Sequence, residues 1–157
     1  MAAIFGAYVE RGSRDQEFLQ IAFSPTSIPL QHRWRNNGLS ADFLSDYVST
    51  FFPGEDSESA DRREEIKSAV AFVANELLEN AMKFNYTPLQ YPVTIGMHLD
   101  QHNARFYVTN SVDPKAIEGF QAVIQRLLSE DTNDLYMEAL EKNEGEENAG
   151  SGLGYLT

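Results

Sequence analysis

The sequence predicts an α+β fold, a two-layer sandwich in which helices cover one face of a mixed, mostly antiparallel sheet. The first observation is that β-prone segments occur both before and after the helical ones, as in sheets whose helices gather on one side. The second is that two such segments, 91–100 and 104–113, are separated only by QHN, a connection typical of a hairpin. The third is the length of 157 residues with 42% apolar content, which favours a single domain, residues 1–157, with a sizeable core.

A hairpin and a helix are expected before residue 53. The segments 4–10 and 17–25 are β-prone, and the turn-like GSRD between them predicts an N-terminal hairpin within residues 1–25. Apolar residues at positions 43, 44, 47, 48 and 51 have helical spacing, so a helix is expected over 40–52 with Ser40 as its N-cap. The apolar residues of this helix are interpreted as core, with a dimer interface as the alternative.

Further helices are expected before and after the 91–113 hairpin. A long helix over about 60–85 is predicted by one apolar stripe, whose members are Ile66, Ala69, Val70, Val73, Leu77 and Phe84. Another helix is expected from Pro114 to about residue 129, because proline favours the first helical turn. A last helix is expected within 133–142.

Charge and composition exclude several classes of partner. With 24 acidic and 12 basic residues the formal net charge is −12, which opposes binding to nucleic acid or to an anionic membrane surface. There is no cysteine, so disulfides and thiolate metal sites are excluded, and a reducing cytoplasm suits the chain. No stretch approaches the roughly 18 apolar residues of a membrane span, and the start does not resemble a secretory signal.

Three polar residues stand out in the long helix, within NELLENAMKFN (75–85). Glu76, Asn80 and Lys83 follow i, i+4, i+7 spacing, so they are expected to project together from the edge of the apolar stripe. An amide oxygen suits Mg²⁺, an ammonium can contact phosphate oxygens, and a carboxylate can take a proton from a nucleophile. The alternative is ordinary surface decoration, with Glu76 paired to Lys83 or to solvent.

A second candidate is the loop AGSGLG at 149–154. Its glycines at alternate positions, Gly150, Gly152 and Gly154, would let backbone amides approach an anion closely. The loop is neither a P-loop nor a Rossmann fingerprint, because no GK[ST] follows and no βαβ unit continues beyond it. The alternative is a flexible acidic linker.

Taken together, these two stretches resemble the GHKL (histidine-kinase-like) superfamily of ATPases. ELLENAMKF is similar to the family's N-box and GSGLGYL to its G2 box, and the resemblance covers residues 40–157. It implies a sandwich of Bergerat type, ATP and Mg²⁺ as cofactors, and an ATP-lid-like region over 113–150. Because the chain stops at LGYLT, where the family continues with a further helix and strands, a C-terminally incomplete domain is expected.

The resemblance also assigns roles to residues. It implies that Asn80 ligates Mg²⁺, Glu76 is the general base and Lys83 contacts phosphate, while the loop glycines Gly150, Gly152 and Gly154 close over the triphosphate. Asn110 stands where the family has its adenine-binding aspartate, and the glycines that normally follow are missing. An amide can bind the adenine amino group without the charge-assisted hydrogen bond, so weaker nucleotide binding is predicted. Asp113 is interpreted as a substitute for that aspartate or as a helix cap.

The expected activity depends on which subgroup of the GHKL superfamily the chain resembles. Glu76 is a glutamate where sensor histidine kinases have asparagine, so the chain is most similar to anti-sigma-factor serine kinases and SiaB-type kinases. This similarity implies phosphorylation of a serine or threonine on a small STAS-like antagonist in a partner-switching system. One alternative is a degenerate scaffold that has lost nucleotide and sequesters a regulatory protein, and another is an ATPase without a protein acceptor. A homodimer formed through an N-terminal strand edge is also open.

Overall fold

The computed structural model describes residues 3–10, 17–24, 34–52, 57–100, 103–131, 133–135 and 137–138. The chain divides into two compact units. One unit is Arg11–Val112, and the other joins Met1–Glu10 to Asp113–Thr157. The border at residue 113 coincides with the start of the region in which an ATP lid is expected.

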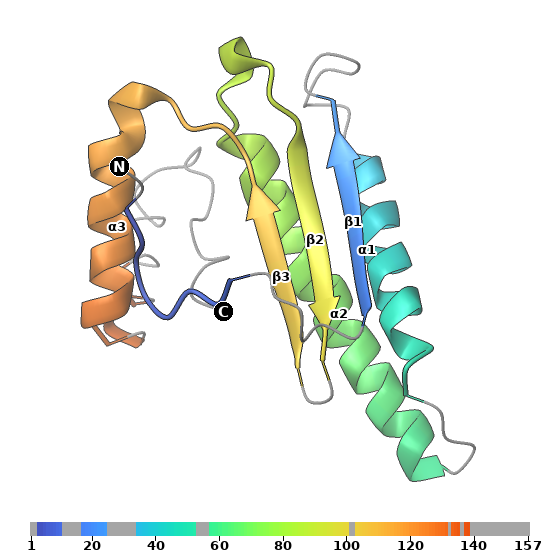
Figure 1. Cartoon of the computed structure of the whole chain (residues 1–157). Helices are drawn as coiled ribbons and strands as arrows, with labels where there is room; N and C mark the ends of the chain where they lie inside the picture. Colours follow the sequence, from blue (N-terminus) through green and yellow to red (C-terminus); the bar gives the residue numbers. More distant parts are fainter. Residues whose placement is uncertain are drawn as a thin grey trace. The chain divides into compact units, whose positions relative to one another are not determined.

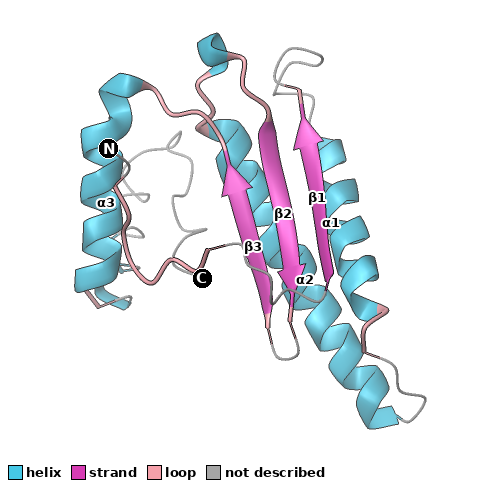
Figure 2. Cartoon of the chain, in the orientation of Figure 1, coloured by secondary structure: helices cyan, strands magenta, loops and turns pink. Residues whose placement is uncertain are grey.

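The unit Arg11–Val112 contains a three-stranded antiparallel sheet with the order β1-β2-β3. Its strands are β1 (Glu17–Phe23), β2 (Val93–Leu99) and β3 (Ala104–Thr109). The helices α1 (Trp34–Ser49) and α2 (Ser57–Lys83) run along the same face of this sheet (Figures 1 and 2). The short 3-10 helix η2 (Thr87–Leu89) connects α2 to β2. The predicted α+β class is therefore confirmed, and within the described residues the sheet is wholly antiparallel.

Strand pairing agrees with one expected hairpin and corrects the other. β2 and β3 pair from Thr94 opposite Thr109 to Leu99 opposite Ala104, as predicted for this part of the chain. Residues 4–10, however, form no strand, and the expected N-terminal hairpin within 1–25 is wrong. β1 pairs along its whole length with β2 instead. Pairing with β2 brings the inward side chains of β1 onto the common core.

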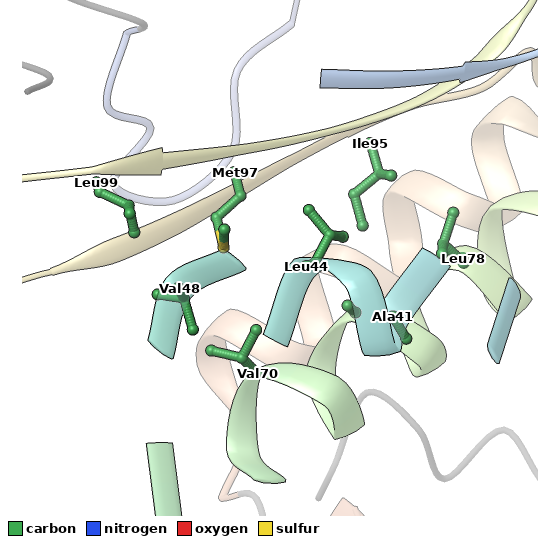
Figure 3. Packing of buried hydrophobic residues seen from close by; sticks show 9 residues of the cluster. Ala41, Leu44, Val48, Val70, Leu78, Ile95, Met97 and Leu99 are labelled. Atoms are coloured by element: carbon green, nitrogen blue, oxygen red, sulfur yellow. The ribbon is translucent and has the colours of Figure 1, made fainter. Parts of the chain in front are cut away.

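The core lies between the sheet and the two helices (Figure 3). Alternate residues of β2 point into it, and Ile95 and Met97 are fully buried there. The helices contribute a matching set of buried side chains, namely Ala41, Leu44 and Val48 from α1 and Val70, Ala74 and Leu78 from α2. Burying one large aliphatic side chain of this kind stabilises the fold by roughly 1.5–3 kcal/mol.

Helix α1 begins six residues earlier than the sequence predicts, at Trp34 rather than Ser40. Ser40 is not its N-cap, because the Ser40 hydroxyl donates to the Asn36 carbonyl, 2.7 Å away, inside the helix. The first turns of α1 also bury Asn37. The polar sequence RNNG concealed this start, since asparagine and glycine are more common in turns and caps than in helices.

Helix α2 spans nearly the predicted range, but its buried face is rotated from the predicted stripe. Val70 is buried as expected, whereas Val73 and Phe84 are exposed. After Val70 the buried positions of α2 are Ala74, Leu78, Ala81 and Met82. Alanines at the centre of this face let α1 approach closely, and Ala41 faces the same core from α1. The large apolar side chains of the predicted stripe therefore did not indicate which flank of α2 is buried.

The second unit contains η3 (Pro114–Ala116) and α3 (Ile117–Ser129). Asp113 caps this helical segment, because its carboxylate accepts a hydrogen bond from the Lys115 backbone N–H at 2.9 Å. The helix start expected at Pro114 is thus confirmed, and so is the capping interpretation of Asp113. Residues 133–135 and 137–138 are helical, within the expected 133–142 helix.

Candidate functional site

The last third of α2 carries the three polar residues that the sequence singled out. Glu76 and Asn80 are partly buried, and Lys83 is exposed at the end of the helix. At 100° per residue the three directions fall within roughly 60° of one another. The half-buried Leu77 and the exposed Phe84 border this set, which we call the α2 ledge. Glu76 and Asn80 owe their partial burial to their position beside the packed face of α2.

The carboxylate and the amide of the ledge have no side-chain partner among the described residues. Neither the Glu76 carboxylate nor the Asn80 amide makes a side-chain hydrogen bond or ion pair with any described residue. The pairing of Glu76 with Lys83, which surface decoration would suggest, is not formed. The Lys83 Nζ instead lies 5.3 Å from the centroid of the Phe84 ring, in a cation–π contact with its own neighbour. A carboxylate, an amide and an ammonium are thus presented together without internal neutralisation.

The chain segments that follow α2 and β3 are joined by hydrogen bonds. The Oδ1 atom of Asn85 accepts from the Ser111 backbone N–H at 3.0 Å, and the Ser111 carbonyl accepts from the Tyr86 N–H at 2.9 Å. Ser111 is buried, so these bonds are shielded from water. We call this arrangement the Asn85–Ser111 clamp. It holds the end of α2, with Lys83, against the end of β3.

Asn110 lies next to this clamp, directly after β3. Its amide Nδ2 donates to the Ser111 carbonyl at 3.2 Å, so one donor of the side chain is used locally. The structure therefore places Asn110 at the same end of the sheet as Lys83. Sequence reasoning missed Asn85 and Ser111. The sequence offers only a weak signal for them, since each is a polar residue shortly after an element, Asn85 after α2 and Ser111 after β3.

The remaining predicted site residues, Gly150, Gly152 and Gly154, lie outside the described residues. Of the three histidines, His98 is described. It is buried in β2 between two aromatic rings, 5.6 Å from Phe18 and 4.8 Å from Tyr107 between ring centroids. These ring contacts identify His98 as a packing residue of the sheet.

The described part of the chain has neither a cluster of metal ligands nor a helix that could span a membrane. No three histidine, aspartate or glutamate side chains gather there in a way that could hold a metal ion. None of the described helices combines the length and the apolar character needed to cross a membrane.

Comparisons of the chain with protein-family models, with curated proteins and with solved structures gave no match. The residues of the α2 ledge and of the Asn85–Ser111 clamp are therefore the basis for a functional assignment.

Proposed function

We propose that this chain is an ATP-binding protein of GHKL type that phosphorylates a serine or threonine on a small STAS-like regulatory protein. The observation that carries the proposal is the α2 ledge, where Glu76 and Asn80 are partly buried and unpaired on one helix flank. Ordinary surface decoration would pair Glu76 with Lys83, and the described residues show no such ion pair. The arrangement of two helices on one face of an antiparallel sheet is consistent with a Bergerat-type sandwich.

The residue types of the ledge fit a nucleotide and its metal. Asn80 would hold Mg²⁺ through its amide oxygen, and Lys83 would contact phosphate oxygens. The magnesium ion supplies charge neutralisation at the phosphates when ATP is bound. Glu76 would accept the proton of the attacking hydroxyl, and its position one turn before Asn80 places it beside the same ligand. Asn110 would contact the base, and Gly150, Gly152 and Gly154 the phosphates.

Titration calorimetry with Mg·ATP tests the nucleotide site. The full chain should bind Mg·ATP saturably, and Asn80→Ala should weaken binding by at least about tenfold through loss of an inner ligand, a change of about 1.4 kcal/mol. Asn75→Ala is the matched control, because Asn75 lies on the same helix but on a different flank and is also partly buried. Equal effects of the two substitutions would contradict the assignment of Asn80.

Phosphate transfer to a purified STAS-domain protein tests the catalytic role. Glu76→Gln keeps the size of the side chain but removes the base, so transfer should slow by roughly 10²–10⁴-fold while Mg·ATP binding persists. Glu79→Gln, a partly buried glutamate outside the ledge, should transfer at the rate of the unaltered chain. A Glu76→Gln variant with full activity would exclude Glu76 as the base.

The second candidate function is a degenerate scaffold that sequesters a regulatory protein without nucleotide. Two observations favour it: the Asn110 amide already donates to the Ser111 carbonyl, and no glycine follows Asn110 before Asp113. A base would have to compete with that local bond. The same calorimetric titration separates the two candidates, since this scaffold would give no heat with Mg·ATP.

A further inference from the structure

Helix α3 has a broad apolar face. At about 100° per residue, its large apolar side chains fall within an arc of about 140°. We call this set the α3 face, and its members are Ile117, Phe120, Val123, Ile124, Leu127 and Leu128. None of the six is buried, and Phe120 is 45% exposed, Val123 50% and Leu128 59%. Because the packing of an apolar stripe supplies most of the stability of a helix in a protein, such a face requires a partner.

The described residues of the same unit cover little of the α3 face. Leu135 is the only buried residue among them. The N-terminal segment reaches one end of α3, because a Cβ atom added to Gly6 would lie 3.3 Å from the Leu128 Cδ2 atom. Leu128 nevertheless stays exposed, as do Ile4 and Tyr8 of that segment. Within the described part of this unit, the α3 face is therefore open.

The C-terminal end of α3 is acidic. Arg126 forms ion pairs with Glu130 at 2.8 Å and with Glu138 at 2.6 Å. Asp131 and Asp134 make no ion pair with any described residue. Four carboxylates and one guanidinium leave a net charge of −3 at this end. The carbonyl groups at the helix C-terminus add partial negative charge to it.

The surrounding sequence is acidic as well. Residues 113–157 contain ten acidic and three basic residues, so they hold −7 of the formal net charge of −12. A partner on the α3 face therefore gains from positive charge. A second copy of this chain does not supply that charge, because the N-terminal end of α3, with Asp113, Lys115 and Glu118, is itself net negative.

We propose that the α3 face is the docking site for a basic amphipathic helix of a partner protein. The partner helix contacts the α3 face through apolar residues at i, i+3 or i+4, and i+7, the usual spacing of helix-in-groove recognition. Its lysine and arginine residues lie at the end of α3 that carries Asp131 and Asp134. The 13 residues of α3 rise about 20 Å, so roughly four turns of the partner helix match the face. This docking needs no nucleotide and uses no residue of the α2 ledge.

Two fluorescently labelled amphipathic peptides of equal length test the site, one of leucine and lysine and the other of leucine and glutamate. Fluorescence anisotropy measures their binding to the full chain in the absence of nucleotide. The leucine–lysine peptide should bind saturably and at least about tenfold more tightly than the leucine–glutamate peptide, because only the first complements the acidic end of α3. Its affinity should fall as the salt concentration rises.

Phe120→Gln tests the apolar contact without a change of charge. It should weaken binding of the leucine–lysine peptide at least about tenfold, because it places an amide without a partner in an apolar contact. Phe72→Gln is the matched control, since Phe72 is a helical phenylalanine that is 52% exposed, but on α2. It should bind the peptide like the unaltered chain, and circular dichroism should confirm that both variants are folded.

Asp134→Lys tests whether the acidic end of α3 contributes. It should weaken binding of the leucine–lysine peptide at least about threefold, because it puts like charges next to each other. Glu65→Lys changes the net charge of the chain by the same amount at an exposed position of α2. This control should leave the affinity unchanged, since Glu65 is not part of the acidic end.

Several results would overturn the proposal. One is a full chain that does not bind the leucine–lysine peptide. Another is an equal effect of Phe120→Gln and Phe72→Gln, or of Asp134→Lys and Glu65→Lys, because the peptide would then bind the acidic chain without using the α3 face. A dimer in sedimentation velocity that Phe120→Gln dissociates would assign the face to a second copy. Binding to vesicles of phosphatidylcholine and phosphatidylserine that is lost in Phe120→Gln would assign it to a membrane.

Discussion

At the residue scale, the Asn85–Ser111 clamp is the feature with the clearest energetic consequence. The Ser111 N–H is buried and has the Asn85 Oδ1 as its acceptor, 3.0 Å away. The Ser111 carbonyl, by contrast, accepts from both the Tyr86 N–H and the Asn110 amide. The loss of Asn85 would therefore leave a buried donor unpaired, whereas the loss of the Asn110 amide would leave its acceptor satisfied.

We accordingly expect Asn85→Ala to lower the free energy of unfolding by about 1–3 kcal/mol and Asn110→Ala to lower it by less than about 1 kcal/mol. Urea titrations followed by circular dichroism measure both values by linear extrapolation. Asn110→Ala serves as the control, because it shortens the other asparagine that hydrogen-bonds to the Ser111 backbone, in the segment that follows β3. Equal losses of unfolding free energy in the two variants would show that the hydrogen bond from the Ser111 N–H to the Asn85 Oδ1 contributes little to stability.

Residue-level prediction from the sequence succeeded where the interactions are local. Helical spacing alone predicted that Glu76, Asn80 and Lys83 share one flank, because that depends only on the helical repeat. The partnership of Asn85 with Ser111 joins residues 26 positions apart, and no local pattern encodes it. The exposure of Val73 and Phe84 could not be foreseen either, since it depends on where α1 packs. The roles of the loop glycines stay predictions.

At the element scale, α1 is the helix that sequence reasoning placed least well. Gly38 lies inside α1, and a Cβ atom added there would meet no atom within 4 Å. The glycine therefore confers no packing advantage that alanine would lose. It does impose the conformational entropy cost that glycine brings to a helix interior.

Gly38→Ala should raise the free energy of unfolding by about 0.5–1 kcal/mol, because alanine restricts the unfolded chain and fits the folded one. Gly6→Ala should do the opposite, since Gly6 has φ of +69° and its Cβ would lie 3.3 Å from the Leu128 Cδ2 atom. Urea unfolding of both variants checks the two signs. A destabilised Gly38→Ala variant would mean that the α1 backbone is not helical at that position.

The strands illustrate why element prediction was incomplete. The hairpin of β2 and β3 was predicted correctly because its two strands are adjacent in sequence and alternate in polarity. The partner of β1 was not, because β1 pairs with a strand some 75 positions away, as in Leu19 opposite Met97. Pairings of this range are decided by the shared core and not by the residues next to the strand.

At the scale of the whole molecule, the two units differ in what they bury. Among the described residues, the two buried apolar clusters lie within Arg11–Val112, together with the three strands and the helices α1 and α2. In α3, by contrast, no residue is buried. The unit Arg11–Val112 thus has the core that an independently folding domain of about 100 residues requires.

A fragment comprising residues 11–112 should therefore fold alone and unfold cooperatively, with an m-value of about 1–3 kcal/mol per M urea. Near-ultraviolet circular dichroism and a urea titration provide the measurement, with the full chain as reference. A fragment with helical signal but without a cooperative transition would indicate that residues 1–10 and 113–157 are needed to fix its core.

The length of α2 has a consequence for how this fold can vary. The 27 residues of α2 rise about 40 Å, whereas the seven residues of β2 span about 23 Å, so the helix extends beyond the sheet. Figure 1 shows the excess at the N-terminal end, where the Arg63 guanidinium Nε donates to the Phe52 carbonyl at 3.1 Å. Whole turns could be gained or lost at that overhang without disturbing the opposite end, where Glu76 and Asn80 stand. The N-terminal end of α2 can therefore vary in length, while its C-terminal end stays fixed against the sheet.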